Sequence, residues 1–174
     1  PDGVNNGFKI KANFTVGGPN GGEEFFVGNL SYPVTWSNTG SVTNVILEYS
    51  ANNWVNEDID FNGTLDAGED LDADLFLDRI ICMVGGTYPN CASTVNDGSF
   101  TWTIADNDTL IPYVCNSTPD PNPDDTVHPC KIENVRIRVM DSGDTAVLDN
   151  SDADFTARYV AKRWNIRDST TGAD

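Results

Sequence analysis

The residues best suited to chemistry lie in one acidic stretch, residues 56–78 (NEDIDFNGTLDAGEDLDADLFLD). This stretch contains nine carboxylates and no Lys or Arg. Two carboxylates about 4 Å apart repel each other by roughly 1 kcal/mol in water and by about 4 kcal/mol at an effective dielectric constant of 20. We therefore expect the stretch either to remain a solvated, loosely ordered loop or to close around a divalent cation.

The spacing of the carboxylates favours the cation. Residues 58–69 fit the calcium-loop pattern D-x-[DN]-x-[DN]-G-x5-E at every position. The expected ligands are side-chain oxygens of Asp58, Asp60, Asn62 and Asp66, the backbone carbonyl of Thr64 and both carboxylate oxygens of Glu69. Gly63 permits the sharp turn in such a loop. Oxygen ligands without Cys or His indicate Ca²⁺ rather than zinc or copper.

The flanking sequence differs from that of EF-hand sensor proteins. Residues 42–54 have the pattern of a strand and a turn, so no amphipathic helix precedes the loop. We therefore expect a static, structural ion rather than a conformational switch. A second, weaker site is predicted in the overlapping segment, with ligands Asp70, Asp72, Asp74, the carbonyl of Phe76 and Asp78. This segment lacks the glycine (Leu75 stands there) and the closing glutamate (Ile81) of the pattern.

The rest of the chain alternates apolar and polar residues with the two-residue period of half-buried strands. The alternating segments are 8–16, 31–36, 44–50, 99–105, 134–140 and 155–161. Gly-, Asn-, Asp- and Pro-rich turns separate them, and no long window shows a helical period. This pattern predicts an all-β fold, an antiparallel β-sandwich. Trp36 and Trp102 lie within alternating segments and are expected in its core.

We interpret residues 1–174 as a single sandwich module. Residues 52–78 form the calcium-loop insertion, and residues 106–131 form a Pro-rich insertion. Residues 5–8 (NNGF) and 152–155 (DADF) each precede an alternating segment. Such an echo is expected of one unit in a tandem array, with 1–16 and 155–174 as inter-module strands. Chance similarity between two strands is the alternative.

The four cysteines are Cys82, Cys91, Cys115 and Cys130, and no two of them form a CxxC pair. A zinc ribbon or a thioredoxin-like site is therefore not expected. Of the three disulfide connectivities, we favour Cys82–Cys91 and Cys115–Cys130, because each pair would staple a loop of turn-forming residues. Four reduced core thiols are the alternative. Disulfides predict a secreted, extracellular protein.

Charge and composition exclude several classes of function. The chain has 27 Asp and Glu against 10 Lys and Arg, a formal net charge of −17, which argues against nucleic-acid binding. The single histidine, His128, removes most acid–base and zinc-hydrolase schemes, so we do not expect an enzyme. No apolar run approaches the roughly 18–20 residues that span a bilayer. The 39% hydrophobic content is too high for a disordered acidic tail.

Residues 19–50 resemble an immunoglobulin-like module that recurs in large bacterial surface proteins. The matching residues are Pro19 to Glu23 (PNGGE), Val27-Gly28, Thr35-Trp36, Gly40, Asn44-Val45 and Tyr49-Ser50, followed by 100–104 (FTWTI) and 135–139 (VRIRV). The module is similar to the N-terminal domain of fungal Ser/Thr-rich, GPI-anchored cell-wall proteins. The resemblance implies an immunoglobulin-like sandwich with a spacer or adhesion role and no catalytic residues.

Together these features predict a calcium-stabilised structural or adhesive module of an extracellular surface or filament-forming protein. Its expected partners are neighbouring copies or modules of the same protein, and polysaccharide. The alternative is a carbohydrate-binding module that uses Trp54, beside the calcium loop, or Trp164 as a contact. A hydrolase using paired carboxylates is the third class. His128 is expected to be exposed to solvent, and a role as a metal ligand is the alternative.

Overall fold

The computed structural model describes residues 11–27, 30–51, 53–62, 66–71, 78–104 and 131–159. Within these residues every regular element is a strand. The strands are β1 (Asn13–Gly18), β2 (Glu24–Val27), β3 (Leu30–Thr39), β4 (Asn44–Ser50), β5 (Ile80–Cys82), β6 (Gly86–Thr87), β7 (Asn90–Cys91), β8 (Ser93–Val95), β9 (Ser99–Ile104), β10 (Lys131–Asp141), β11 (Asp144–Asn150) and β12 (Phe155–Tyr159). No helix in this part of the chain is long and apolar enough to cross a membrane.

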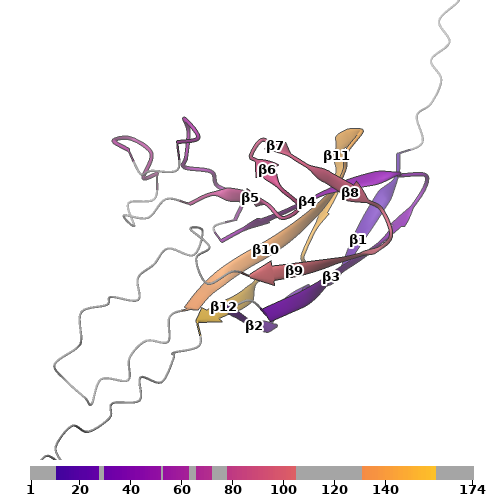
Figure 1. Ribbon diagram of the computed structural model, residues 1–174, viewed down its shortest axis with the longest axis horizontal. Helices are drawn as coiled ribbons and strands as arrows, with labels where there is room; N and C mark the ends of the chain where they lie inside the picture. The colour runs from indigo at the N-terminus through magenta and orange to yellow at the C-terminus, as the bar shows by residue number, and fades with distance from the viewer. Residues whose placement is uncertain are drawn as a thin grey trace, which may run out of the picture.

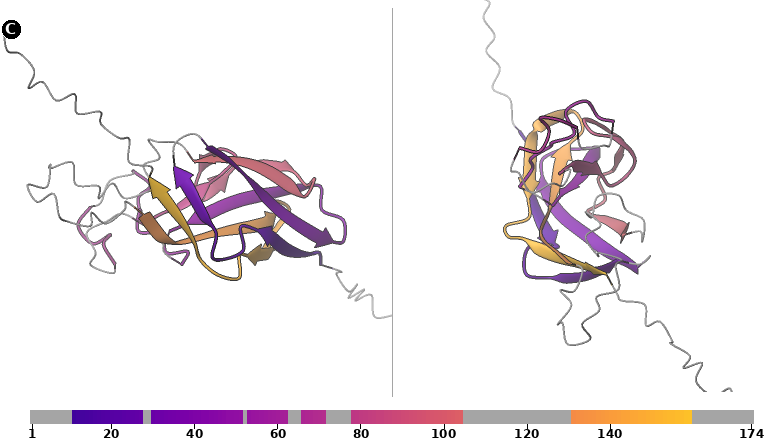
Figure 2. Two further views of the ribbon diagram at one scale, coloured as in Figure 1. Left: turned by 90° about the horizontal axis from the view of Figure 1, so that it is seen from below. Right: turned by 90° about the vertical axis from the view of Figure 1, so that its left-hand side faces the viewer.

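The strands form two main sheets that pack against each other (Figures 1 and 2). The smaller sheet has the order β1-β3-β9, and the larger has the order β2-β12-β10-β4-β5. β8 also pairs with β4, β11 also pairs with β10, and β6 and β7 form a separate hairpin. The predicted all-β sandwich is therefore confirmed. Its pairing is antiparallel except between β2 and β12, which are parallel.

Alternation in the sequence explains which side chains form the core. Each of the two sheets contributes one buried face. The buried apolar side chains include Phe14, Val16, Val34, Trp36, Val45, Leu47, Trp102, Ile104, Val135, Ile137, Val139 and Phe155. Both tryptophans predicted in the core are buried, and the indole N–H of Trp36 donates to Oδ1 of Asn96 at 2.7 Å. The backbone N–H of Val16 donates to Oδ2 of Asp149 at 2.8 Å, which joins β1 to β11 across one side of the sandwich.

The PNGGE motif docks a turn onto the segment that precedes β12. The N–H groups of Asn20 and Gly21 donate to the carboxylate of Glu23 at 2.8 and 2.7 Å. Burial raises the pKa of Glu23, but these hydrogen bonds outweigh that effect, so its pKa lies below the usual value. Gly21 has φ +134°, and a Cβ there would lie 2.5 Å from that of Ala153. The motif therefore requires glycine at this position because of both backbone conformation and contact.

Candidate metal centre

The acidic loop connects β4 to β5 at one end of the larger sheet (Figure 1). Its two ends meet where the N–H of Glu57 donates to the carbonyl of Asp78 at 2.8 Å. Glu57 and Asp78 thus form the stem at which the loop begins and ends. β4 and β5 pair as far as Ser50 and Ile80, so the sandwich holds the two ends of the loop close together.

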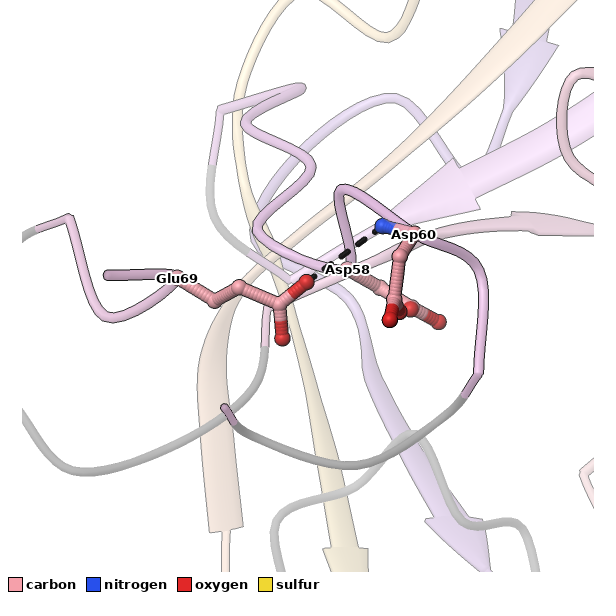
Figure 3. Close-up of side chains that lie close together, drawn as sticks. All are labelled: Asp58, Asp60 and Glu69. Atoms are coloured by element: carbon pink, nitrogen blue, oxygen red, sulfur yellow. Dashed lines mark hydrogen bonds between the residues drawn. The ribbon is translucent and has the colours of Figure 1, made fainter. Parts of the chain in front are cut away.

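Three carboxylates of the loop converge on one point. Oxygen atoms of Asp58, Asp60 and Glu69 all lie within 4.8 Å of one another (Figure 3). Asp58 and Glu69 are buried, with 4% and 5% of their surface exposed, whereas Asp60 is exposed. These are positions one, three and twelve of the predicted calcium loop. The structure therefore brings together two acids from the start of the loop and the acid that closes it.

Backbone N–H groups hold Glu69 in this position. Its Oε1 accepts hydrogen bonds from Ile59 N at 2.8 Å and Asp60 N at 3.4 Å, and its Oε2 accepts one from Asp66 N at 3.0 Å. One carboxylate thus ties three points of the loop together. The chain curls around this group, which is the position that a bidentate closing ligand must take.

Asn62 and Asp66 line the exposed side of the same loop. The side-chain amide of Asn62 donates to Oδ2 of Asp60 at 2.8 Å and to Oδ2 of Asp66 at 2.7 Å, and its backbone N–H donates to Oδ1 of Asp60 at 3.1 Å. A half-turn of this amide presents its oxygen in place of its nitrogen. The residues present therefore fit a hard cation, because all available donors are oxygens.

Other residues of the predicted sites are placed less completely. Thr64 lies outside the described residues, as do Asp72, Asp74 and Phe76 of the second, weaker site. Of that second site, Asp70 is half-buried and Asp78 is buried. The described residues thus support a candidate centre at Asp58, Asp60 and Glu69, and the second site stays a prediction.

Two residues beside the centre were not singled out by the sequence pattern. Arg79, which immediately precedes β5, places its Nη1 3.5 Å from Oδ2 of Asp58, and only 18% of its side chain is exposed. Glu57 is fully buried, and its carboxylate accepts hydrogen bonds from Leu71 N at 2.6 Å and Asp78 N at 3.1 Å. Glu57 therefore acts on the loop's stem, while Arg79 places a positive charge beside a candidate ligand.

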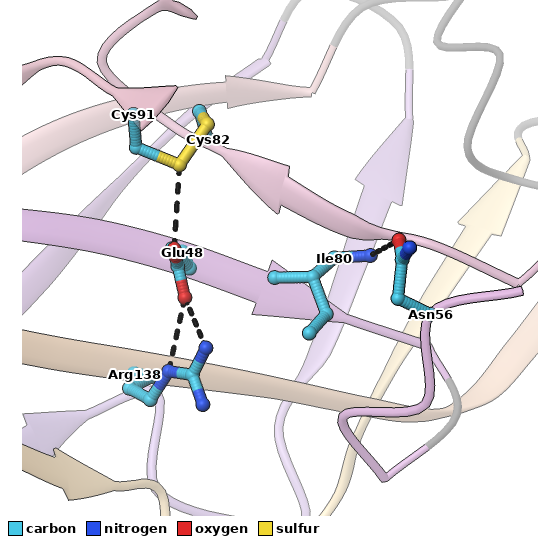
Figure 4. The surroundings of a disulfide bond; sticks show 6 residues. All are labelled: Glu48, Asn56, Ile80, Cys82, Cys91 and Arg138. Carbon is cyan, nitrogen blue, oxygen red and sulfur yellow. Dashed lines mark hydrogen bonds and ion pairs between the residues drawn. A yellow bond between two sulfur atoms is a disulfide. The ribbon is translucent and has the colours of Figure 1, made fainter. Parts of the chain in front are cut away.

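A disulfide braces the strand that follows the loop (Figure 4). Cys82 and Cys91 are bonded, with their Cα atoms 5.1 Å apart, as predicted. Beneath it, the buried carboxylate of Glu48 accepts hydrogen bonds from Nε of Arg138 at 3.0 Å and from its Nη2. The Sγ atom of Cys91 lies 3.3 Å from Oε1 of Glu48. Cys115 and Cys130 lie outside the described residues.

The aromatic residue beside the centre differs from the one expected. Trp54 is half-buried, and the guanidinium of Arg138 lies over its ring, 4.2 Å from the ring centroid. A sugar therefore finds that face of Trp54 covered. Phe61 is instead exposed, and its ring centroid lies 6.3 Å from that of Tyr88. These two rings line a pocket of about 200 Å³ with Asp58 and Arg79.

Trp164 and His128, also considered in the sequence, lie outside the described residues. Family models, curated proteins and solved structures give no match for this chain. The interpretation therefore depends on the geometry of the loop and on the sequence pattern that the loop carries. A disulfide is consistent with an extracellular protein.

The position of Arg79 leads to a prediction about cation affinity. In Arg79→Met the repulsion between the guanidinium and the cation is removed, so calcium should bind about fivefold more tightly, roughly 1 kcal/mol. Arg79→Lys keeps the charge and should stay close to wild type. Calorimetric titration of both variants checks this, with thermal unfolding in chelator to confirm that the folded state is retained. Equal affinities in the Met and Lys variants would contradict the prediction.

Proposed function

We propose that this chain is a calcium-stabilised structural or adhesive module of an extracellular surface or filament-forming protein, and that it catalyses no reaction. The observation that carries the proposal is the convergence of Asp58, Asp60 and Glu69 within 4.8 Å. These residues occupy ligand positions of a twelve-residue pattern whose residue types are those of a calcium loop. Calcium would neutralise a cluster of carboxylates that otherwise repel one another.

The electrostatics of the centre favour calcium over softer metals and a structural over a catalytic ion. The ligand atoms are carboxylate and amide oxygens, which are hard donors. The closing carboxylate is buried and held by three backbone N–H groups, so the loop is ordered around it. We infer that the ion fixes the loop between β4 and β5 and stiffens this end of the sandwich. Extracellular modules of this kind bind calcium at about 10⁻⁴ to 10⁻³ M.

The proposed membership in an immunoglobulin-like family of surface modules is supported by the contacts of its PNGGE motif. Asn20 accepts from Asp152 N through its side-chain oxygen at 2.7 Å, and its carbonyl accepts from Ala153 N at 3.1 Å. Asn20, Gly21 and Glu23 of the motif thus each make a specific hydrogen bond in this turn. The turn ties the segment before β2 to the segment before β12, which supports a compact spacer module.

A calcium titration tests the proposal. We expect a calorimetric dissociation constant of about 0.1–1 mM, and magnesium should bind more weakly because it demands a smaller octahedral site. At a calcium concentration ten times this constant, the free energy of unfolding should rise by about 1.4 kcal/mol. Asp58→Ala should lose this gain, whereas the matched control Asp144→Ala, outside the loop, should keep it. No heat of binding at millimolar calcium would overturn the proposal.

The pocket between Phe61 and Tyr88 favours carbohydrate binding as a second candidate function. Phe61 belongs to the calcium loop, with φ +60°, and 46% of its surface is exposed. Aromatic faces beside a cation and hydrogen-bonding groups suit the apolar and polar sides of a pyranose ring. Retention of the protein by insoluble polysaccharide, lost in Phe61→Ser but kept in Leu71→Ser, would favour this candidate over a purely structural role.

A further inference from the structure

A groove opens between two strands that lie at edges of the main sheets in the described part of the chain. Within the described strands, β9 is an edge of the smaller sheet, and β5 is an edge of the larger sheet. The groove between them has a volume of about 410 Å³. Its lining consists of the apolar residues Tyr49, Ile81, Met83, Phe100 and Trp102 together with Cys82, Thr101 and Thr103.

The apolar side chains of the groove belong to the hydrophobic core or pack against it. Tyr49 and Trp102 are buried, with ring centroids 4.9 Å apart, and form its floor. Ile81, Met83 and Phe100 are half-buried and pack against the core. A sheet edge beside such apolar side chains offers both backbone hydrogen bonds and side-chain pockets, which are the two requirements for adding a strand.

The sequence contains a strand-like segment that β3 is too short to pair. The alternation of residues 8–16 begins at Phe8. However, β1 begins at Asn13, which pairs with Thr39, the last residue of β3. Gly40, with φ +90°, then turns the chain away. Phe8 and Ile10 therefore come before Asn13, the residue of β1 that pairs with the end of β3.

The charge of this segment is opposite to that of the body. Residues 1–12 contain Lys9, Lys11 and Asp2 and have a net charge of +1. Because the formal net charge of the whole chain is −17, the other residues together carry −18. Two copies of such an anionic body repel each other. Residues 1–12 are therefore a segment of one copy that the anionic body of a second copy attracts.

We propose that residues 5–10 of a second copy of this chain add a strand to the edge of β9 and place Phe8 and Ile10 in the groove. The segment has the same six-residue length as β9. The donor segment and the groove are different surfaces of one molecule, so the contact is head-to-tail. Where each copy donates to one neighbour and accepts from another, repetition of this contact gives an open chain of modules.

Complementary variants test the exchange. Deletion of residues 1–10 removes the donor and leaves every described strand intact, while Phe100→Asp places a charge in the groove. By light scattering after gel filtration, wild type should form species that grow with protein concentration, and each variant alone should stay monomeric. A mixture of the two should form a one-to-one dimer that grows no further. The control Val95→Asp, at an exposed β8 position outside the groove lining, should assemble like wild type.

Two results would overturn the inference. Wild type that stays monomeric at high concentration would have no such exchange. A deletion variant that assembles as well as wild type has a different contact. The inference rests on the proposed function for its partner, a neighbouring copy. Calcium titration of the deletion variant separates the two, because lost assembly with retained calcium binding leaves the calcium proposal standing.

Discussion

Glu69→Gln should weaken calcium binding by at least about 100-fold, or roughly 3 kcal/mol. The substitution removes the negative charge and one of the two oxygens with which Glu69 would hold the ion. In wild type, Ile59 N and Asp66 N donate to opposite oxygens of the Glu69 carboxylate. The glutamine has only one oxygen, so its NH₂ group faces one of these two backbone donors. The loop therefore loses a calcium ligand and a hydrogen bond that holds it together. Calorimetric titration measures the affinity, and thermal unfolding with calcium and with chelator measures its effect on stability.

Glu23→Gln is a matched control for this variant. Glu23 also accepts hydrogen bonds from two backbone N–H groups, but it lies in the PNGGE turn rather than in the acidic loop. It should lose some stability equally in calcium and in chelator, with calcium affinity unchanged. A Glu69→Gln protein that still binds calcium within about threefold of wild type would show that Glu69 only holds the loop together.

Alternating segments that pair antiparallel within the sandwich could be read from the sequence. Residues 44–50 were expected as a strand and form β4, and residues 99–105 correspond to β9. β2 was missed because EFFV does not alternate, and its parallel partner β12 lies more than a hundred residues away. β11 was missed because its apolar residues do not alternate: Ala146, Val147 and Leu148 are consecutive, and of these only Val147 is buried. Pairings between distant segments depend on tertiary packing that local periodicity does not record.

The candidate site also contains residues that the sequence predicts and residues that it does not. Asp58, Asp60 and Glu69 could be predicted because the spacing of a calcium loop is local to twelve residues. Arg79 follows the loop by ten residues, and its approach to Asp58 depends on where β5 begins. Glu57 precedes the pattern by one residue and is one acid among nine. Nothing in its neighbours distinguishes a fully buried carboxylate from a solvated one, because its partners are backbone groups 14 and 21 residues further on.

Glu57→Gln should lower the free energy of unfolding by about 2–3 kcal/mol, although Glu57 is not an expected calcium ligand. The carboxylate of Glu57 accepts from Leu71 N and from Asp78 N through different oxygens. An amide offers one acceptor and turns its donors toward the other N–H, which leaves a buried backbone group unpaired. Because these bonds join both sides of the loop's stem, the loop should also bind calcium several-fold more weakly.

Urea unfolding in chelator isolates the effect on the stem, and calorimetry measures the effect on calcium. Glu24→Gln is the matched control, since Glu24 is an exposed glutamate that pairs with Arg158 on the surface. The free energy of unfolding of Glu24→Gln should fall by less than about 1 kcal/mol, as is usual when an exposed ion pair is removed. If Glu57→Gln unfolded like Glu24→Gln and bound calcium like wild type, the stem would be held by other contacts. In the expected case, Glu57 contributes to the folding of the calcium loop although it lies one position outside the calcium pattern. The backbone groups that hold its buried charge belong to the same loop that positions Asp58 and Glu69.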